Sequence, residues 1–123
     1  MRRHSALFAA AIALAGLTAP SPAAEAPFQP RLLRLAEVLG SLHYLRNLCG
    51  EESTQWRDQM QKLIEAENPA AELKARYVAS FNRGYRSYEG TYVKCTASAT
   101  EAIARFMKEG EELSRDIAVR YGN

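Results

Sequence analysis

The sequence has few of the residues that form metal-binding or redox centres. Its 123 residues include two cysteines and two histidines, and one of the histidines, His4, precedes a leader-like apolar run. The remaining His43 and the widely separated Cys49 and Cys95 are too few for a metal site, which needs three or four ligands. The cysteines also lack the C-x-x-C spacing that lowers a thiol pKa. We therefore expect no metal, no haem and no other cofactor.

Recognisable catalytic motifs are missing too. The sequence has no G-x-S-x-G, H-E-x-x-H, P-loop or dinucleotide-binding pattern. The adjacent carboxylates of Glu51-Glu52 and Glu111-Glu112 cannot face each other across a substrate, as the two carboxylates of a glycosidase must. A pairing of Glu52 with Glu89 stays open, although no pattern singles it out. The sequence favours a protein that is not an enzyme.

An excess of charge of one sign is absent as well. The chain has 16 Lys and Arg against 14 Asp and Glu. Arg2 and Arg3 belong to the predicted leader, so the rest of the chain has 14 basic and 14 acidic residues. Nucleic-acid binding through counterion release needs a basic surface. We therefore expect no nucleic-acid partner.

The N-terminal segment has the three-part pattern of a secretory signal. A short basic segment precedes the apolar run Leu7 to Leu17, and a small, proline-rich segment follows it. The run has 11 residues, whereas a membrane-spanning helix needs about 20. The pattern predicts a signal peptide over residues 1–23, a linker over 24–30 and one periplasmic domain over 31–123. An uncleaved membrane anchor is the alternative; after cleavage we expect no stable membrane span.

Hydrophobic periodicity predicts four helices and no strand. Each helix is bounded by residues that favour helix ends. The fourth opens with Ser98-Ala99-Thr100-Glu101, a capping-box pattern, and the third could break at Gly90. In chain order the predicted helices run from about Arg31 to Cys49, from Ser53 or Thr54 to the residue before Asn68, from Pro69 to Tyr92 or Cys95, and from Ser98 to Arg120.

One apolar stripe on each helix predicts the core. Two glycines, Gly84 and Gly110, interrupt these stripes; since a glycine inside a helix costs about 1 kcal/mol, we expect close helix packing there, with a kink as the alternative. The stripes consist of Leu32, Leu35, Val38, Leu39, Leu42, Leu45 and Cys49; Trp56, Met60, Leu63 and Ile64; Leu73, Tyr77, Phe81, Tyr85, Tyr88, Tyr92 and Cys95; and Ala99, Ile103, Phe106, Met107, Leu113, Ile117 and Tyr121.

The order of the helices and the two cysteines support the same fold. Short connections make consecutive helices antiparallel, so the first and third helices end at the same end of the bundle. Those ends carry Cys49 and Cys95. A secretory leader and an even cysteine count independently favour a disulfide. We predict an all-α, up-down-up-down bundle with one Cys49–Cys95 disulfide, which stabilises the fold by roughly 4 kcal/mol in the chain-entropy treatment.

Polar and aromatic residues on the first three helices form the candidate binding site. Arg46 projects within the apolar stripe of the first helix, so it is either in a structural ion pair or part of an anion-binding cleft with His43. Trp56 is either a core anchor or a hot spot for a partner, next to Arg57.

The third helix adds four candidates to this site. Asn82 and Arg86 share a face, because they are four residues apart. Tyr85 and Tyr88 belong either to the core or to a polar cleft with Arg46.

These stretches carry a resemblance to a known family. The segments Leu42 to Cys49, Gln55-Trp56-Arg57 and Phe81-Asn82-Arg83-Gly84-Tyr85-Arg86, which leads to Cys95, resemble small secreted alphaproteobacterial proteins built on a domain of unknown function. The resemblance is carried by a Phe-Asn-x-Gly-Tyr-Arg string between two cysteines. It implies a location and an architecture but no reaction.

Three functions are compatible with the sequence. The first is a non-catalytic periplasmic protein that binds another envelope protein or serves as a scaffold. The second is a stress holdase, which would expose apolar surface in acid. The third is a peptidoglycan-acting enzyme, which would require Arg46, His43 and a glutamate to converge in one pocket.

Overall fold

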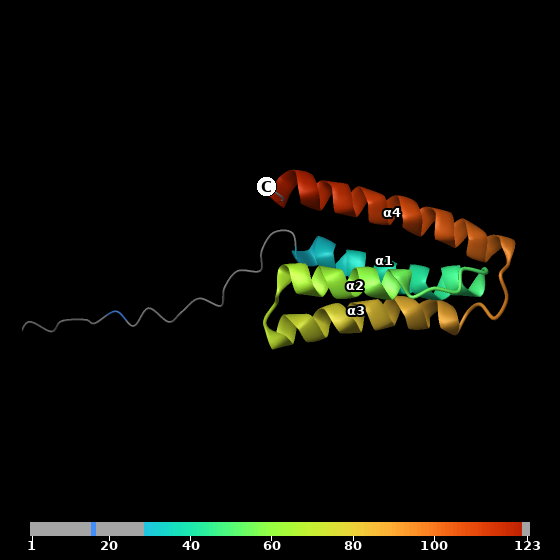
Figure 1. Cartoon of the computed structure of the whole chain (residues 1–123), viewed down its shortest axis with the longest axis horizontal. Helices are drawn as coiled ribbons and strands as arrows, with labels where there is room; N and C mark the ends of the chain where they lie inside the picture. Colours follow the sequence, from blue (N-terminus) through green and yellow to red (C-terminus); the bar gives the residue numbers. More distant parts are fainter. Residues whose placement is uncertain (1–15, 17–28, 122–123) are drawn as a thin grey trace, which may run out of the picture.

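The computed structural model describes residues 29–121, together with Gly16, and every regular element in it is an α-helix. The predicted signal peptide, apart from Gly16, and residues 24–28 of the predicted linker lie outside the described residues. The all-α, up-down-up-down architecture is confirmed (Figure 1). The four helices are α1 (Gln29–Leu48), α2 (Gln55–Glu67), α3 (Ala71–Glu89) and α4 (Ala97–Tyr121).

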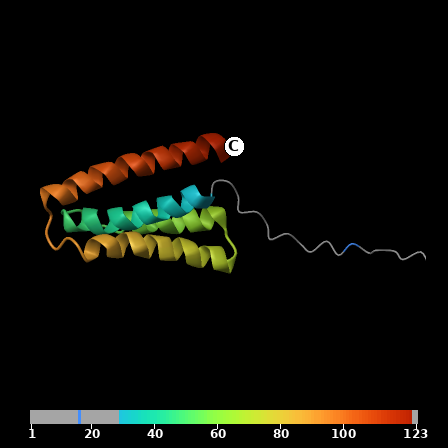
Figure 2. The same cartoon turned by 180° about the vertical axis from the view of Figure 1, so that it is seen from behind.

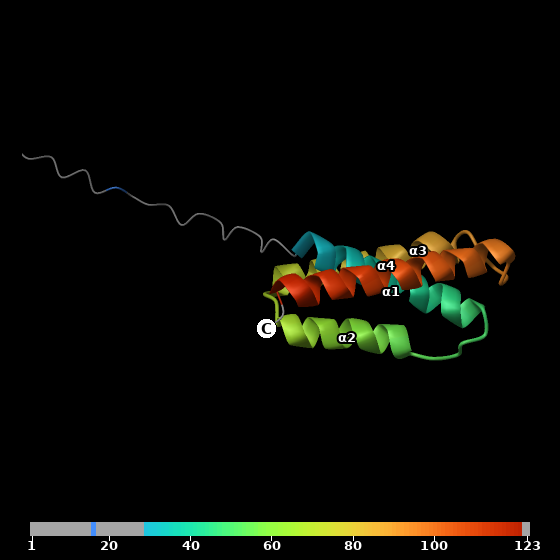
Figure 3. The same cartoon turned by 90° about the horizontal axis from the view of Figure 1, so that it is seen from above.

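Helix α1 is the centre of the bundle. It packs against all three other helices, and it lies between α3 and α4 in the front and rear views (Figures 1 and 2). Helix α2 also touches α3, whereas the backbone of α4 approaches only that of α1 within the described residues. Seen from above, α2 lies to one side of the other three helices (Figure 3), and it contacts α1 and α3. The seam between α1 and α3 is therefore covered by α2, and the seam between α1 and α4 is not.

The core follows the predicted stripes, with α1 contributing most of it. Met107 is an exception, because 40% of it is exposed on α4, whose backbone approaches only that of α1 within the described residues. The position of α1 among three neighbours also buries Ala36, Gly40 and Ser41, which lie outside its predicted stripe. The buried apolar residues are Leu32, Ala36, Val38, Leu39, Leu42, Leu45, Trp56, Met60, Ile64, Tyr77, Phe81, Ala99, Ala102 and Ile103.

Glycines bring α1 and α3 unusually close together. A Cβ on Gly84 would lie 2.0 Å from the carbonyl oxygen of Glu37, and a Cβ on Gly40 would lie 1.9 Å from that of Phe81. The predicted close approach at Gly84 is confirmed, whereas the role of Gly40 was not predicted. At Gly110 the contact is looser, since a Cβ there would lie 3.4 Å from Val38 Cγ1. Helices α3 and α4 continue unbroken through their glycines.

Several predicted helix ends were wrong by a few residues. Helix α3 starts at Ala71, after Pro69, and it ends at Glu89 with Gly90 as its C-cap. The predicted break at Gly90 is therefore confirmed, whereas the predicted ends at Tyr92 or Cys95 are wrong. Tyr92 and Cys95 therefore lie in the connection to α4, where the Tyr92 carbonyl accepts a hydrogen bond from the Tyr44 hydroxyl.

The cap of α4 also differs from the prediction. The Oγ1 of Thr96 accepts a hydrogen bond from the Ala99 amide at 3.2 Å, as an N-cap residue does. Thr96 rather than Ser98 therefore begins the helix, because α4 starts at Ala97.

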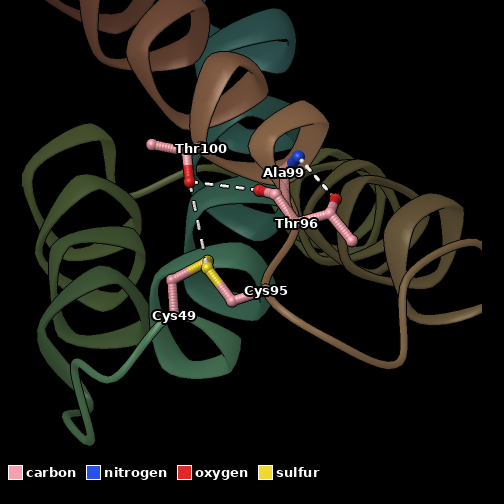
Figure 4. Close-up of a disulfide and its surroundings, with 5 residues drawn as sticks. All are labelled: Cys49, Cys95, Thr96, Ala99 and Thr100. Carbon is pink, nitrogen blue, oxygen red and sulfur yellow. Dashed lines mark hydrogen bonds between the residues drawn. A yellow bond between two sulfur atoms is a disulfide. The ribbon is translucent and has the colours of Figure 1, made fainter.

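The predicted disulfide joins the end of α1 to the connection between α3 and α4. Cys49 and Cys95 are bonded, with their Cα atoms 4.9 Å apart, and Thr96, Ala99 and Thr100 surround them (Figure 4). Since Cys95 lies two residues before α4, the bond also anchors the start of α4 to the end of α1. No helix within residues 29–121 has the length and apolarity to cross a membrane.

Candidate functional site

The Arg46 side chain is held by an internal carboxylate. Its guanidinium donates to Glu51 in the loop after α1 and lies over the Trp56 ring, 6.0 Å from the ring centroid. Glu51 Oε1 also accepts hydrogen bonds from Trp56 Nε1 at 3.0 Å and from the Ser53 hydroxyl at 3.2 Å. Burial raises the pKa of the Glu51 carboxyl, but the hydrogen bond and charge of Arg46 and the other two donors outweigh burial and lower it. We call Arg46, Glu51, Ser53 and Trp56 the Glu51 cluster.

The Glu51 cluster fixes the loop between α1 and α2. Of the two interpretations of Arg46, the structure supports the ion pair, because the guanidinium fork is already occupied. Trp56 is a core residue with 8% of its surface exposed. The only polar group of its side chain, the indole N–H, donates a hydrogen bond to Glu51, so the indole offers only carbon atoms to its other neighbours.

His43 and Tyr85 lie together in a different hollow, of about 470 Å³, between the end of α1, the loop after it and α3. The His43 ring contacts Tyr85 and Phe81, with ring centroids 5.7 and 5.8 Å apart. Burial lowers the pKa of His43; the charge of Arg57 lowers it further, and that of Asp58 opposes this. The neutral imidazole is therefore favoured in the folded protein.

The other candidate residues lie apart from these two groups. Arg57 and Asn82 are exposed and line a hollow of about 210 Å³ between α2 and α3. Arg86 is exposed on α3. Tyr88 is half-buried between α3 and α4, where it stacks on Tyr92 and meets Phe106 edge to face. The eight candidates therefore do not form one cleft, and partner binding by them stays a prediction.

Another hollow involves residues that the sequence interpretation assigned to the core. It is a groove of about 480 Å³ whose floor is α1 and whose walls are α2 and α4. Met107, which the apolar stripe of α4 placed in the core, lines this groove and is exposed. We call this hollow the α2–α4 groove; its lining consists of Leu35, Val38, Leu39, Leu42, Trp56, Gln59, Met107, Lys108, Gly110, Glu111 and Ser114.

Few polar groups are available at the rim of the α2–α4 groove. Glu111 is paired with Arg115 at 2.8 Å. Among the described side chains, no carboxylate lies within ion-pair distance of Lys108, so its ammonium is the rim charge that a ligand can use. No cluster of three or more potential metal ligands occurs among residues that the structure describes.

A comparison with protein families gives a match over most of the chain. The model of a family described as "Protein of unknown function (DUF2385)" matches residues 27–121, which include all four helices. A search of curated proteins and a search of solved structures found no match. The expected resemblance to a domain-of-unknown-function family is thereby confirmed, while secretion and taxonomic range stay predictions. The chain belongs to the DUF2385 family.

Proposed function

We propose that this protein is a non-catalytic binding or scaffolding protein of the bacterial periplasm. The observation that carries the proposal is that the charged side chains of the candidate site bind each other, while a separate groove is apolar. Arg46 and Glu51 bind each other and hold a loop, while the α2–α4 groove is lined mainly by apolar side chains. An apolar hollow with few polar groups is typical of binding sites.

Export is supported by two independent features. The N-terminal 23 residues have the pattern of a secretory signal. The domain contains a disulfide, and such bonds persist in oxidising compartments.

A reporter fusion tests the export. Alkaline phosphatase, which is active only outside the cytoplasm, should be active when fused after residue 123 and inactive when residues 1–23 are deleted. Protein from the periplasmic fraction should lack free thiols. An inactive full-length fusion, or free thiols in secreted protein, would contradict periplasmic function.

A crosslinking experiment tests the binding. Crosslinking in the periplasm followed by purification should give discrete complexes with envelope proteins or a retained ligand. Protein that is exported and folded but has neither would count against the binding role.

A holdase is the second candidate, and the attachment of α4 favours it. Helix α4 packs on α1, and Arg34 forms a bidentate ion pair with Glu109 at 2.7 and 3.0 Å, while Arg31 pairs with Asp116 at 3.4 Å. Protonation of these carboxylates in strong acid removes both pairs. Helix α4 would then open from its C-terminal end, while the disulfide holds its start.

Acid behaviour distinguishes the holdase from the first candidate. A holdase should suppress aggregation of an acid-denatured client at pH 2–3 and bind a fluorescent apolar dye there. Glu109→Gln should shift dye binding to higher pH, whereas Glu101→Gln, on the same helix but outside these pairs, should not. Absence of suppression at pH 2–3 would remove this candidate.

The enzyme alternative lacks its required arrangement. Arg46 and Glu51 line a hollow beneath the disulfide, and His43 lines the separate one beside Tyr85. We therefore do not propose a peptidoglycan-acting enzyme.

A further inference from the structure

The α2–α4 groove is a slot between two helices with α1 as its floor. Most of the floor and Trp56 on the α2 wall are almost fully covered: Val38 is 0% exposed, Leu42 2%, and Leu39 and Trp56 8% each. Leu35 on the floor is half-buried, and Gln59 on the α2 wall is exposed. A typical protein–protein interface needs about 800 Å² of accessible surface on each side. Side chains this well covered offer little area to a docking helix, whereas the volume of about 480 Å³ is in the range of small-molecule sites.

The surfaces inside the slot are apolar. Leu35, Leu39 and Leu42 follow one another along the floor, and Met107 forms part of the α4 wall. The Trp56 indole contributes only carbon, because its N–H is bonded to Glu51. Met107 has a flexible, polarisable side chain that adapts to ligands of different shape. A slender alkyl chain fits this lining.

The rim supplies one usable charge. Lys108 follows Met107 on α4 and lines the groove, and no described carboxylate neutralises it. The other rim charge, Glu111, is neutralised by Arg115. Gln59 and Ser114 add hydrogen-bonding groups to the rim. The mouth of an apolar slot therefore has a positive charge, which is complementary to an anionic head group.

We propose that the α2–α4 groove binds a single-chain amphiphile with an anionic head, of the fatty-acid carboxylate class. The alkyl chain lies along α1 between α2 and α4, and the carboxylate pairs with Lys108. This inference rests on the proposed binding function and names the class of ligand.

Trp56 makes the proposal directly measurable. It is the single tryptophan of the chain and lines the groove, so its fluorescence reports occupancy. Titration of the folded, oxidised protein with dodecanoate below its micelle concentration should give a saturable change with one site per chain. Dodecyltrimethylammonium, with the same chain and opposite charge, should bind more weakly. Circular dichroism in parallel should show that the helices are retained.

Matched variants assign the binding to the groove. Lys108→Gln should weaken dodecanoate binding by up to about fivefold, as loss of a solvent-exposed ion pair predicts, and Lys62→Gln on the outside of α2 should not. Ser114→Phe should fill the groove and abolish the fluorescence change. Ala104→Phe, at an exposed position of the same helix outside the groove, is its control.

The possible outcomes separate this proposal from the proposed function. Absence of a saturable change, equal binding of both amphiphiles, or insensitivity to Ser114→Phe would overturn the ligand assignment. If crosslinked periplasmic complexes persist in that case, the binding function stands and its partner is a protein. If dodecanoate binds as expected but the alkaline phosphatase fusion is inactive, the ligand assignment stands and periplasmic function fails.

Discussion

Replacing Gly84 by alanine tests the helix packing that determines the fold. The added Cβ would lie 2.0 Å from the Glu37 carbonyl oxygen and 2.9 Å from Ser41 Oγ. The first of these atoms is backbone, so α1 and α3 must separate by more than about 1 Å to restore normal contact. Overpacking of this kind costs about 1–3 kcal/mol, and the loss of contacts along the seam adds to it. The higher helix propensity of alanine offsets about 1 kcal/mol of this, which leaves up to about 2 kcal/mol from overpacking. With the lost seam contacts added, we expect a net destabilisation of about 2 kcal/mol.

Gly110→Ala is the matched control. It is also a glycine inside a helix that packs on α1, but its Cβ would lie 3.4 Å from the movable Val38 Cγ1. Here the propensity gain should dominate and stabilise the protein by up to about 1 kcal/mol. Because 1 kcal/mol shifts Tm by about 4–8 °C in a domain of this size, the two variants should differ in Tm by at least about 10 °C. The assay is thermal unfolding followed by circular dichroism at neutral pH.

Gly40→Ala extends the test to the other side of the seam. A Cβ there would lie 1.9 Å from the Phe81 carbonyl oxygen, so this variant alone should be as harmful as Gly84→Ala. Once one substitution has moved the helices apart, the second should cost less, and the double variant should lose less stability than the two single variants combined. If Gly84→Ala raised Tm as much as Gly110→Ala, the close crossing of α1 and α3 would be refuted.

Three further predictions concern the disulfide, the Glu51 cluster and His43. Reduction of the disulfide to two thiols should add two hydrogen atoms to the intact mass. The double variant Cys49→Ser/Cys95→Ser should lose about 4 kcal/mol of unfolding free energy in urea, since the bond closes a loop over a sequence separation of 46; an unchanged midpoint would contradict this. Arg46→Ala should lower the free energy of unfolding by about 1–2 kcal/mol, which is less than the loss for a buried pair because 37% of the Arg46 side chain is exposed. Arg57→Ala, the control, should lower it little, and equal losses in the two variants would refute the ion-pair role. The His43 pKa is lowered in the folded state, so the unfolded chain binds more protons as the pH falls. The contribution of His43 to stability should therefore fall as the pH drops below 6.5, the ordinary pKa of histidine, and reach its minimum below the folded-state pKa. His43→Gln should remove this part of the pH dependence, and an unchanged profile would exclude His43 as its source.

The helices and the disulfide could be predicted because they depend on local pattern and chain order. The apolar stripes identified the buried faces, and antiparallel neighbours placed Cys49 and Cys95 at the same end. Helix ends were less accurate, because several residues compete to begin a helix. Thr96 and Ser98 are both favourable N-cap residues. In the structure Thr96 is the N-cap, and it directly follows Cys95, whose position is fixed by the disulfide.

The arrangement of the helices around α1 could not be predicted in the same way. Periodicity specifies that α4 has an apolar face but not how many neighbours will cover it. Met107 was therefore expected in the core, and the α2–α4 groove was not foreseen. Likewise, the loop residue Glu51 takes the Arg46 guanidinium, and the path of that loop is not encoded in the helical pattern.

The segment that carried the family resemblance builds the contact between α1 and α3. Phe81 is buried against α1, and Gly84 permits the close approach of the two backbones. Arg83 reaches Glu37 at 3.2 Å, and Tyr85 packs edge to face on Tyr44.

An ion-pair chain continues this contact across the bundle. Glu37 also pairs with Arg34 at 3.2 Å, and Arg34 pairs with Glu109, so the chain extends from α3 over α1 to α4. The hydrogen bond from Glu109 raises the pKa of Arg34, although burial opposes it. Helix packing alone accounts for the Phe, Gly and Tyr of the motif, since each contacts α1. None of these motif residues lines the α2–α4 groove, so the proposed binding can be tested there without disturbing the contact between α1 and α3.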